Sequence, residues 1–510
     1  MRNKIISAED AARLVPDGAT VGSIGGGGGL VEADAVLAAI EARFLTTGSP
    51  RKLRFVHSLG IGDRGERGVN RLAHEGLVEK VIGGHWVWSP RMQALAREEK
   101  IEAYVLPGGV TAQLMREIGA GRPGLITHVG LGTFVDPRQD GGRMNKRAKD
   151  ELVTLIEIDG QTLLRYKPFP IDVAVLRGSF ADADGNVSIE QEAANLEIRA
   201  MAMAARNSGG KVIVQVRTAV ERGVLSARAV HIPSAMVDAI VVDPEQPQSH
   251  EFFYDPTVSG ERRGILPPEP PRPLSIREVV ARRAAKELFK GAVINYGFGM
   301  PDAIPKIVAQ RDETDQYYQT IEHGTYGGTL MEGSQFGFAQ NPTCMIDSPS
   351  QFDFYGGGGL DIAFLGFGQF DQQGNVNVSK LGGVTVGPGG FIDIAQNARK
   401  VVFCGAFEAK GAKFDLADGK LTIKHHGEVQ KLVKQVDQIT FSGQQAVTSG
   451  QTVLYVTERA VFELTKDGLC LRELAPGVDQ QKDVLNRMAF TPIVVGDILT
   501  MPDDCFLTDV

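Results

Sequence analysis

The sequence predicts an α/β protein made of two related open α/β domains with mainly parallel sheets. Three observations support this fold class. Short apolar runs alternate with helix-length segments along the chain, the two halves carry the same sequence pattern at a constant spacing, and a proline-rich segment separates them. The apolar runs expected to form strands are Leu53–His57, Ala103–Leu106, Val212–Val216, Ile240–Val242, Ala363–Phe367 and Val401–Cys404.

The internal repeat links positions 172 and 361, which are 189 residues apart. In the first half Asp172–Leu176 is followed by Asp182–Val187, and in the second half Asp361–Leu365 is followed by Asp371–Val376. The same spacing relates the strand that begins at Lys211 to the one that begins at Lys400, without a gap. We therefore expect two domains that arose by duplication.

Proline marks the boundary between the halves, because it favours extended linkers over helices and sheets. The expected organisation is an N-terminal domain over residues 1–243, a linker over 244–274, and a C-terminal domain over 275–510 that carries the candidate catalytic acid. The linker prolines are Pro244, Pro247, Pro256, Pro267, Pro268, Pro270, Pro271 and Pro273.

Both halves begin with a helix, a strand and a glycine-rich loop. In the first half Ser7–Val15 predicts the helix and Ala19–Ile24 the strand, and Gly25–Gly29 then precedes a helix expected over Leu30–Phe44. Ligands of open α/β sheets bind beyond the carboxyl ends of strands, so such loops are candidate sites. The pentaglycine matches neither a phosphate-binding nor a dinucleotide motif, so a tight turn and a ligand loop both stay open.

The second half opens in the same way, with a helix over Ser275–Phe289 and a strand over Lys290–Ile294. The halves diverge after the repeated Asn-Val pair. The first continues with a helix expected over Gln191–Arg206, whereas the second runs through the glycine-rich segment Leu381–Phe391. We expect exposed backbone there, and a second flexible loop at Gly356–Gly359.

Composition excludes several classes of protein. The formal charge of −8 gives no basic excess for nucleic acid. The four cysteines lack metal or redox spacing, which favours a reduced, cytoplasmic setting. The N-terminal segment turns acidic too early for a signal peptide, no apolar stretch is long enough to span a bilayer, and no metal site is predicted.

Glu322 is the acid most suited to covalent chemistry. It ends a strand-like segment and opens onto a turn of small residues, Gly324–Gly328. An ionised carboxylate can attack an activated acyl carbon, and glycine amides can stabilise the resulting oxyanion. Considered alone, an acid at a strand end is more often a solvated surface group.

With these features together, the sequence resembles a family I coenzyme A transferase of the acetate, propionate and 3-ketoacid branch, in which both domains share one chain. The resemblance spans about residues 5–500. The motifs that carry it are Gly83–Trp86 with Ser89–Arg91, Gly130–Arg138 with Gly141–Asn145, Ser350–Tyr355, Gly389–Asp393 and Thr457–Phe462.

The resemblance implies an active site between two open α/β domains and a ping-pong transfer of coenzyme A from an acyl-CoA to a short-chain carboxylic acid. Glu322 would carry first the acyl group, as an anhydride, and then coenzyme A, as a thioester. Coenzyme A is thus substrate and covalent intermediate, with no permanent cofactor and no metal. Relatives are homo-oligomers, dimers or tetramers.

The resemblance also assigns roles to individual residues. It implies that Gly390 donates an amide to the oxyanion and that Gly389 and Lys410 contact coenzyme A. The coenzyme A loop is implied at Gly297, Phe298, Gly299, Met300 and Pro301.

Two departures from the family pattern stand out. His323 follows Glu322 where many relatives have asparagine, and it either tunes the carboxylate or packs. The first-half loop lacks an asparagine that assists the oxyanion in relatives. Two alternative functions stay open: an acyl-CoA hydrolase on the same scaffold, and a non-enzymatic ligand-sensing α/β module.

Overall fold

The structure is a computed structural model that describes residues 3–267 and 272–508. The chain folds into two compact units. Unit 1 comprises Met1–Gly264, Glu322–Asp353 and Gly382–Asp393, and unit 2 comprises Ile265–Ile321, Phe354–Leu381 and Ile394–Val510. Two short segments of the second half therefore belong to unit 1.

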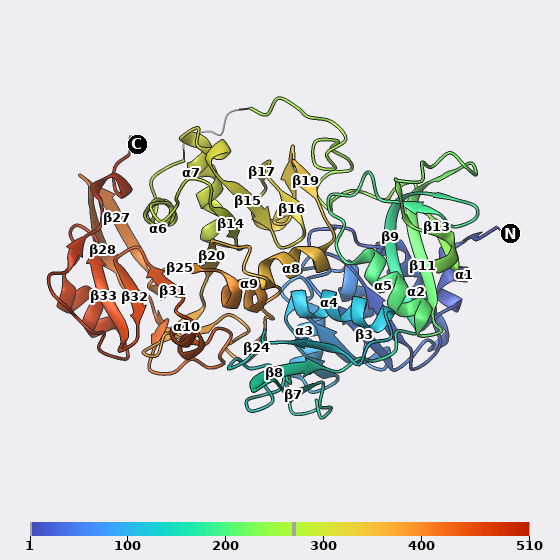
Figure 1. The fold of residues 1–510 in the computed structure, drawn as a ribbon, viewed down its shortest axis with the longest axis horizontal. Helices are drawn as coiled ribbons and strands as arrows, with labels where there is room; N and C mark the ends of the chain where they lie inside the picture. The colour runs from blue at the N-terminus through green and yellow to red at the C-terminus, as the bar shows by residue number, and fades with distance from the viewer. Residues whose placement is uncertain (1–2, 268–271, 509–510) are drawn as a thin grey trace. The chain divides into compact units, whose positions relative to one another are not determined.

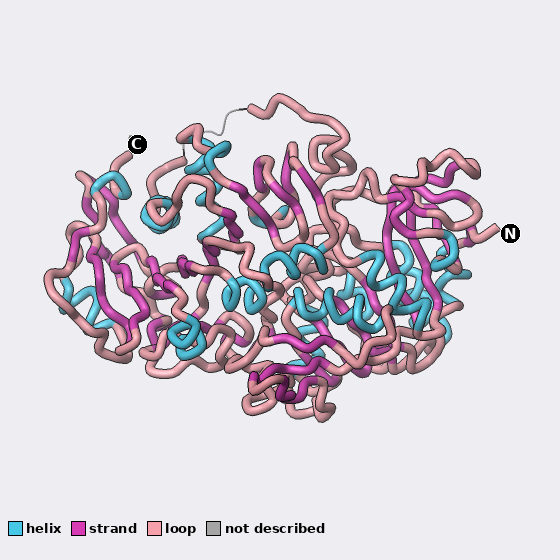
Figure 2. Tube along the Cα trace, viewed as in Figure 1, coloured by secondary structure: helices cyan, strands magenta, loops and turns pink. Residues whose placement is uncertain are grey.

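The domain boundaries expected at residues 243 and 275 stay a prediction, because the compact units group segments by contact and not by chain order. Within the described residues between 243 and 275 no helix or strand is found, and Figure 2 shows this segment as loop. Residues 268–271 of the expected linker lie outside the described residues.

Unit 1 is built on a sheet with the order β1-β13-β11-β9-β2-β3-β4-β5, in which every adjacent pair is parallel. Helix α5 packs on β9 and β11, and α4 packs on α5, all visible in the blue and green part of Figure 1. Its principal elements are β1 (Ile5–Ile6), α1 (Ala8–Arg13), β2 (Thr20–Ser23), α2 (Asp34–Thr47), β3 (Leu53–His57), β4 (Val78–Gly83), α3 (Pro90–Arg97), β5 (Glu102–Tyr104), α4 (Gly108–Gly119), β9 (Val173–Asp182), β10 (Val187–Ser188), α5 (Ile198–Asn207), β11 (Lys211–Val220), β12 (Val230–Ile232) and β13 (Ala239–Val242).

Smaller sheets complete unit 1. One has the order β6-β8-β7, and another is the antiparallel pair of β17 with β18, from the segment that follows Glu322. Strands β16 and β19 of the same segment also pair antiparallel. Their bounds, with that of the short strand β24, are β6 (Leu125–Thr127), β7 (Val153–Ile158), β8 (Gln161–Tyr166), β16 (Thr325–Tyr326), β17 (Thr329–Leu330), β18 (Ala339–Gln340), β19 (Cys344–Met345) and β24 (Val384–Thr385).

Unit 2 has a second large sheet, with the order β15-β14-β20-β25-β31-β32-β33-β34. Its pairs from β15 to β31 are parallel, and β32 and β33 add antiparallel pairs. The strands of this sheet and the helices of unit 2 are α6 (Ile276–Ala285), β14 (Val293–Tyr296), α7 (Ile304–Gln310), β15 (Tyr318–Ile321), β20 (Ile362–Gly366), β25 (Lys400–Cys404), α10 (Gly443–Ser449), β31 (Thr452–Val456), β32 (Ala460–Thr465), β33 (Gly468–Leu474) and β34 (Leu499–Thr500).

The remaining elements of unit 2 are short strands, and two helices continue from unit 1 into unit 2 along the chain. The strands are β21 (Gln369–Asp371), β22 (Val376–Asn377), β23 (Lys380–Leu381), β26 (Glu408–Ala409), β27 (Lys413–Ala417), β28 (Lys420–His425), β29 (Val429–Gln430) and β30 (Leu432–Val433), and the two helices are α8 (Ser348–Gly356) and α9 (Phe391–Asn397). The prediction of an α/β fold with mainly parallel sheets is confirmed.

The strand registers reproduce the predicted repeat. In unit 1 Lys211 of β11 pairs with Val173 of β9, and in unit 2 Lys400 of β25 pairs with Ile362 of β20. These are the positions that the 189-residue spacing equates. The two sheets therefore share strand neighbours and register, as expected of a duplication.

Helices α2 and α5 begin later than the sequence predicts. Helix α2 begins at Asp34 instead of Leu30, and α5 begins at Ile198 instead of Gln191. Val31 and Leu196, just before each helix, have left-handed φ angles of 54° and 49°. A right-handed helix excludes such residues, so neither helix can extend back to the predicted start.

The expectation of exposed backbone over Leu381–Phe391 is wrong for most of the segment. Only Gly382 and Gly383 are exposed, the backbone from Gly387 to Gly390 is buried, and α9 follows directly. The loop is buried because its amides and carbonyls bond to residues 84–108 of the N-terminal half, as described below. The second expected loop is partly helical, since Gly356 is the last residue of α8.

Membrane-spanning helices and clustered metal ligands are both absent from the described residues. Among residues 3–267 and 272–508, no helix is long and apolar enough to cross a membrane. The same residues contain no group of three or more histidines, cysteines or acids arranged to hold a metal ion.

Candidate active site

Glu322 directly follows β15 in the chain and is half-buried. The backbone N–H of Gly390 donates to its Oε2 at 3.0 Å. Burial raises the pKa of Glu322 to about 7, and the Gly390 hydrogen bond lowers it only in part. No lysine or arginine in the described part of the chain forms an ion pair with this carboxyl. Glu322 is therefore a basic, weakly solvated carboxylate near neutral pH.

Gly390 is in direct contact with this carboxyl. A Cβ at Gly390 would overlap Glu322 Oε2 and would lie 2.8 Å from the ring of Phe352. Only glycine therefore lets the amide approach the carboxyl this closely. The two residues predicted as catalytic, Glu322 and Gly390, lie together.

Within unit 1, backbone hydrogen bonds hold the glycine loop against segments of the N-terminal half. The amide of Gly389 donates to Gly84 O at 2.9 Å, and the carbonyl of Gly389 accepts from Gly108 N at 2.7 Å. Trp86 N donates to Val386 O at 2.7 Å. Because Gly389 O and Gly390 N belong to one planar peptide group, the bond from Gly108 N fixes the direction of the Gly390 amide.

Asp393 strengthens this attachment from the first turn of α9. Its carboxyl accepts the amides of Gly109 and Val110, at the start of α4, at 3.0 and 2.9 Å. Burial raises the pKa of Asp393 to about 8, and the charge of Glu322 adds to the increase. Asp393 is buried and Glu322 is half-buried, and the two carboxyls interact, which disfavours charging both at once.

His323 packs against glycines and is not charged. Its ring is buried, and a Cβ at Gly26 or Gly337 would lie 2.7 or 2.9 Å from it. Burial lowers the pKa of His323 to about 4, against a small opposing effect of a hydrogen bond to the Gly26 backbone. Of the two roles considered for His323, the packing one fits this environment, since a neutral ring adds no charge beside Glu322.

The pentaglycine of unit 1 forms a tight turn. Gly27, Gly28 and Gly29 have φ angles of 87°, 61° and 90°, which disfavour any other residue. Gly28 O accepts from His250 N at 2.9 Å, and Gly26 N and Gly28 N donate to carbonyls within unit 1. Several of its polar groups are therefore already engaged in structure.

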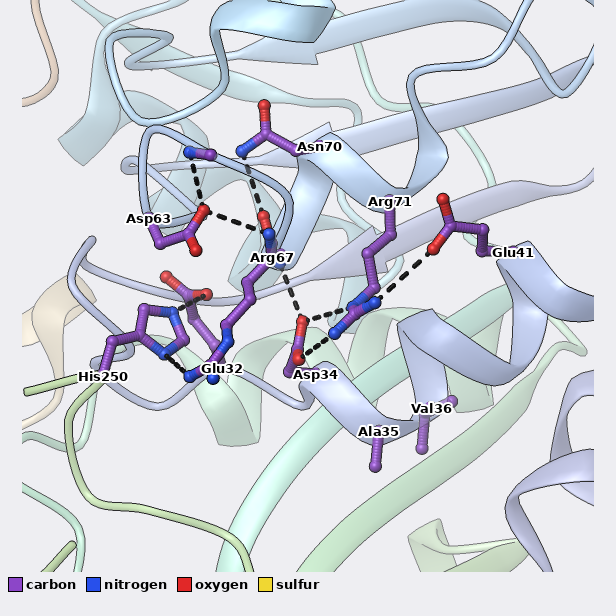
Figure 3. Close-up of polar contacts among 12 residues, drawn as sticks. Glu32, Asp34, Ala35, Val36, Glu41, Asp63, Arg67, Asn70, Arg71 and His250 are labelled. Carbon is purple, nitrogen blue, oxygen red and sulfur yellow. Dashed lines mark hydrogen bonds and ion pairs between the residues drawn. The ribbon is translucent and has the colours of Figure 1, made fainter.

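A polar network fixes the chain that follows this turn (Figure 3). Glu32 accepts a hydrogen bond from Gly62 N at 2.8 Å and lies 3.3 Å from Nε2 of His250. The other ring nitrogen of His250, Nδ1, is 3.2 Å from Arg67. Burial raises the pKa of Glu32. Beside it Asp34 pairs with Arg71, which also reaches Glu41. These side chains bond to one another, so the network is structural.

The residues assigned to coenzyme A by resemblance divide between the units. Gly389 lies beside Glu322 in unit 1, whereas residues 297–301 and Lys410 belong to unit 2. Gly297 follows β14, and its N–H donates to Phe364 O at 2.8 Å. Phe298 and Lys410 are exposed. Their contact with coenzyme A stays a prediction.

Three residues at this site were not predicted from the sequence: Asp393, and His85 and Leu59, which lie within 4.0 Å of the point where a Cβ of Gly389 would stand. The first two lie within quoted motifs, Gly389–Asp393 and Gly83–Trp86, so the signal was present without a role. Leu59 lies in an ordinary strand-end segment and has no distinguishing pattern.

Comparisons with known proteins agree on one family. A family model described as Coenzyme A transferase matches residues 5–243. The chain is 42% identical over 507 residues to acetate CoA-transferase YdiF of Escherichia coli O157:H7, covering 99% of this chain and 96% of the relative. It is 46% identical over 512 residues to caffeate CoA-transferase of Acetobacterium woodii, covering 99% and 97%.

A solved structure also matches the whole chain. The crystal structure of YdiF from E. coli O157:H7, a thioester complex with CoA, superimposes with a TM-score of 0.94 at 41% identity. The match covers 99% of this chain and 96% of that one.

Proposed function

Because the chain belongs to the coenzyme A transferase family and is a CoA-transferase, we propose that it works by a ping-pong mechanism through covalent intermediates on Glu322. We propose short-chain acids of the acetate, propionate or acetoacetate type as substrates. The observation that carries the proposal is the contact of Glu322 with the Gly390 amide, on a carboxyl whose burial raises its pKa. Similarity to an acetate CoA-transferase supports the substrate class.

In the first step an oxygen of ionised Glu322 attacks the acyl carbon of the donor acyl-CoA. The carbon–sulfur bond breaks, and coenzyme A leaves as a thiolate with the electron pair. The product is an acyl-glutamyl anhydride. A thiolate is stable enough to leave without a proton, so this step needs no acid catalyst.

In the second step the thiolate attacks the glutamyl carbonyl of the anhydride, and the original acid leaves as a carboxylate. Negative charge develops on the glutamyl oxygen, where the Gly390 amide donates its hydrogen bond. The resulting glutamyl-CoA thioester then reacts with a second carboxylate by the reverse sequence. The related crystal structure of YdiF, a thioester complex with CoA, supports such an intermediate.

Isotope exchange tests the proposal. With acetyl-CoA and labelled acetate but no second acid, a ping-pong enzyme moves label into acetyl-CoA, because the half-reaction is reversible. A hydrolase would instead release free coenzyme A at a rate independent of acetate, and a sensing module would do neither. Absence of exchange from active enzyme would overturn the mechanism. Repeating the exchange with labelled propionate and acetoacetate defines the acyl preference.

A further inference from the structure

Glu322 uses its two carboxyl oxygens differently. Oε2 accepts the Gly390 amide, whereas no donor to Oε1 is found among the described residues. Under the mechanism proposed above, on which this inference rests, Oε1 is the oxygen free to attack the acyl carbon. The residues on that side of the carboxyl must then receive the acyl group.

Gly389 leaves room for one carbon atom beside Oε1. The point where its Cβ would stand lies 3.7 Å from Glu322 Oε1, 3.9 Å from Leu59 Cδ2 and 4.0 Å from His85 Cβ. The φ angle of Gly389, 57°, favours glycine, so this point stays unfilled. Oε1, Leu59 and His85 thus border one vacant position.

Attack at this position creates an oxyanion that Gly390 cannot serve. The new charge forms on the acyl oxygen of the substrate, while the Gly390 amide is bonded to the other oxygen of Glu322. A second hydrogen-bond donor on the Oε1 side would stabilise this charge. In the pentaglycine turn the amides of Gly26 and Gly28 already donate to Leu30 O and Gly62 O.

His85 offers a side-chain donor beside this position. It follows β4 closely, at the carboxyl end of a parallel strand, and its ring is half-buried. No hydrogen bond or ion pair of His85 is found in the part of the chain that the structure describes. Its neighbours Gly84 and Trp86 bond to the loop that carries Gly390, which fixes the backbone of His85 relative to Glu322.

The surroundings keep this imidazole neutral. Burial, His57 and Arg64 all lower the pKa of His85. A neutral imidazole has one N–H, which can donate a hydrogen bond without giving up its proton. The ring lies beside Gly60, where a Cβ would be 3.1 Å from Nδ1.

We propose that His85 is a catalytic residue whose N–H donates a hydrogen bond to the acyl oxygen of the substrate when Glu322 Oε1 attacks. As the oxygen–carbon bond forms, the carbonyl electrons move onto that oxygen. As the intermediate collapses, the carbon–sulfur bond breaks and coenzyme A leaves as thiolate. His85 keeps its proton throughout, so it stabilises charge and transfers nothing.

The test is the exchange of labelled acetate into acetyl-CoA by His85→Leu and His85→Asn. His85→Leu removes the donor and should lower kcat by about 10²–10³-fold with little change in KM, as for loss of an oxyanion donor. His85→Asn keeps a side-chain N–H and should recover at least part of that loss. His74→Leu, a histidine paired with Glu41 away from Glu322, is the matched control and should exchange at the wild-type rate.

Tryptophan fluorescence checks that the His85 variants fold normally around the substituted residue. The two tryptophans of the chain, Trp86 and Trp88, lie close to His85 in sequence, so their fluorescence reports its local packing. His85→Leu with wild-type exchange would overturn the inference. An equal fall in kcat in His85→Leu and His85→Asn would also overturn it. So would a tryptophan spectrum of His85→Leu that differs from wild type, because altered packing would then explain the fall in kcat. Failure of the wild-type protein to exchange label would instead overturn the proposed mechanism.

Discussion

The two repeats form the same turn and diverge directly after it. Asp182 accepts the amides of Asp184 and Asn186 at 3.0 Å each, and Asp371 accepts those of Gln373 and Asn375 at 3.0 Å each. The first repeat then continues towards α5, which covers its own sheet. The second continues into a loop that ends at Gly390.

The strand partners make the common origin clear. Asp172 Oδ2 accepts from Thr20 N at 2.7 Å in the first repeat, and Asp361 Oδ2 accepts from Val293 N at 3.0 Å in the second. The two repeats therefore differ in the segment after the turn, while their strands keep equivalent hydrogen bonds.

The 189-residue spacing equates Ile198, the first residue of α5, with Gly387, but α9 begins only at Phe391. The second repeat therefore has a glycine loop where the first has the first turn of its helix, and this loop directs the Gly390 amide at a carboxyl.

Substitution of Glu322, the carboxyl that the second repeat's loop contacts, should cause the largest loss of activity. Glu322→Gln removes the nucleophile and should lower kcat by about 10⁴-fold or more. Glu322→Asp withdraws the carboxyl by one methylene and should lose about 10²-fold or more. Both are measured by acetate exchange. Near-normal exchange in Glu322→Gln would move the chemistry to another residue.

Gly390→Ala tests the glycine loop itself. The new Cβ would overlap Glu322 Oε2, so the amide must move away, and kcat should fall by about 10²–10³-fold. Gly356→Ala makes the same change where a Cβ meets nothing within 4 Å, and it should keep wild-type kcat. Equal kcat in the two variants would show that the loop does not serve the reaction.

The pH dependence follows from the raised pKa of Glu322. The carboxyl attacks only when ionised, so kcat/KM should fall as the pH decreases through about 7. An ordinary solvated glutamate would instead hold its activity down to about pH 4.5. An acid limb near that lower value would contradict the buried environment described for Glu322.

The raised pKa of Glu322 also predicts that the fold loses stability as the pH rises, while the activity increases. The folded-state pKa exceeds the unfolded value, so ionised Glu322 destabilises the fold as the pH rises from 4.5 to about 7. At pH 8 the free energy of unfolding of Glu322→Gln should therefore exceed that of the wild type by about 1–3 kcal/mol, and its melting temperature should be higher. At pH 4 the two proteins should melt at the same temperature. Melting curves at both pH values measure this, and a lower melting temperature at pH 8 would refute it.

The smallest expected effect is that of Lys410→Ala in unit 2. Lys410 is exposed, so loss of its charge should raise the KM for acyl-CoA only a few-fold and leave kcat unchanged. Initial-rate kinetics at low and high salt measure it. A large fall in kcat would mean that Lys410 has a role in the chemical step.

Local pattern was enough to predict much of the fold. The buried strands are short apolar runs, and β3 coincides with the predicted Leu53–His57. The constant spacing of the repeat predicted the shared sheet frame. The predicted starts of α2 and α5 were wrong because of Val31 and Leu196. A left-handed residue with a bulky side chain is stabilised by its surroundings and has no sequence signature.

The site was predictable only in part, for a related reason. Glu322 and Gly390 were found through resemblance to a family, and the structure brings them together. The packing of Asp393 on α4, and the position of His85 beside Gly389, depend on which loops meet across the fold. Residues far apart in sequence, such as His85 and Gly389, give no local pattern that reveals that they lie close together.

A covalent role for Glu322 is tested by finding where coenzyme A becomes attached. The purified protein is incubated with acetyl-CoA, reduced with borohydride or treated with hydroxylamine, and mapped by peptide mass spectrometry. We expect modification at Glu322 in the wild type and none there in Glu322→Gln. Modification at any other residue, or exchange activity with an unmodified Glu322, would contradict a glutamyl intermediate.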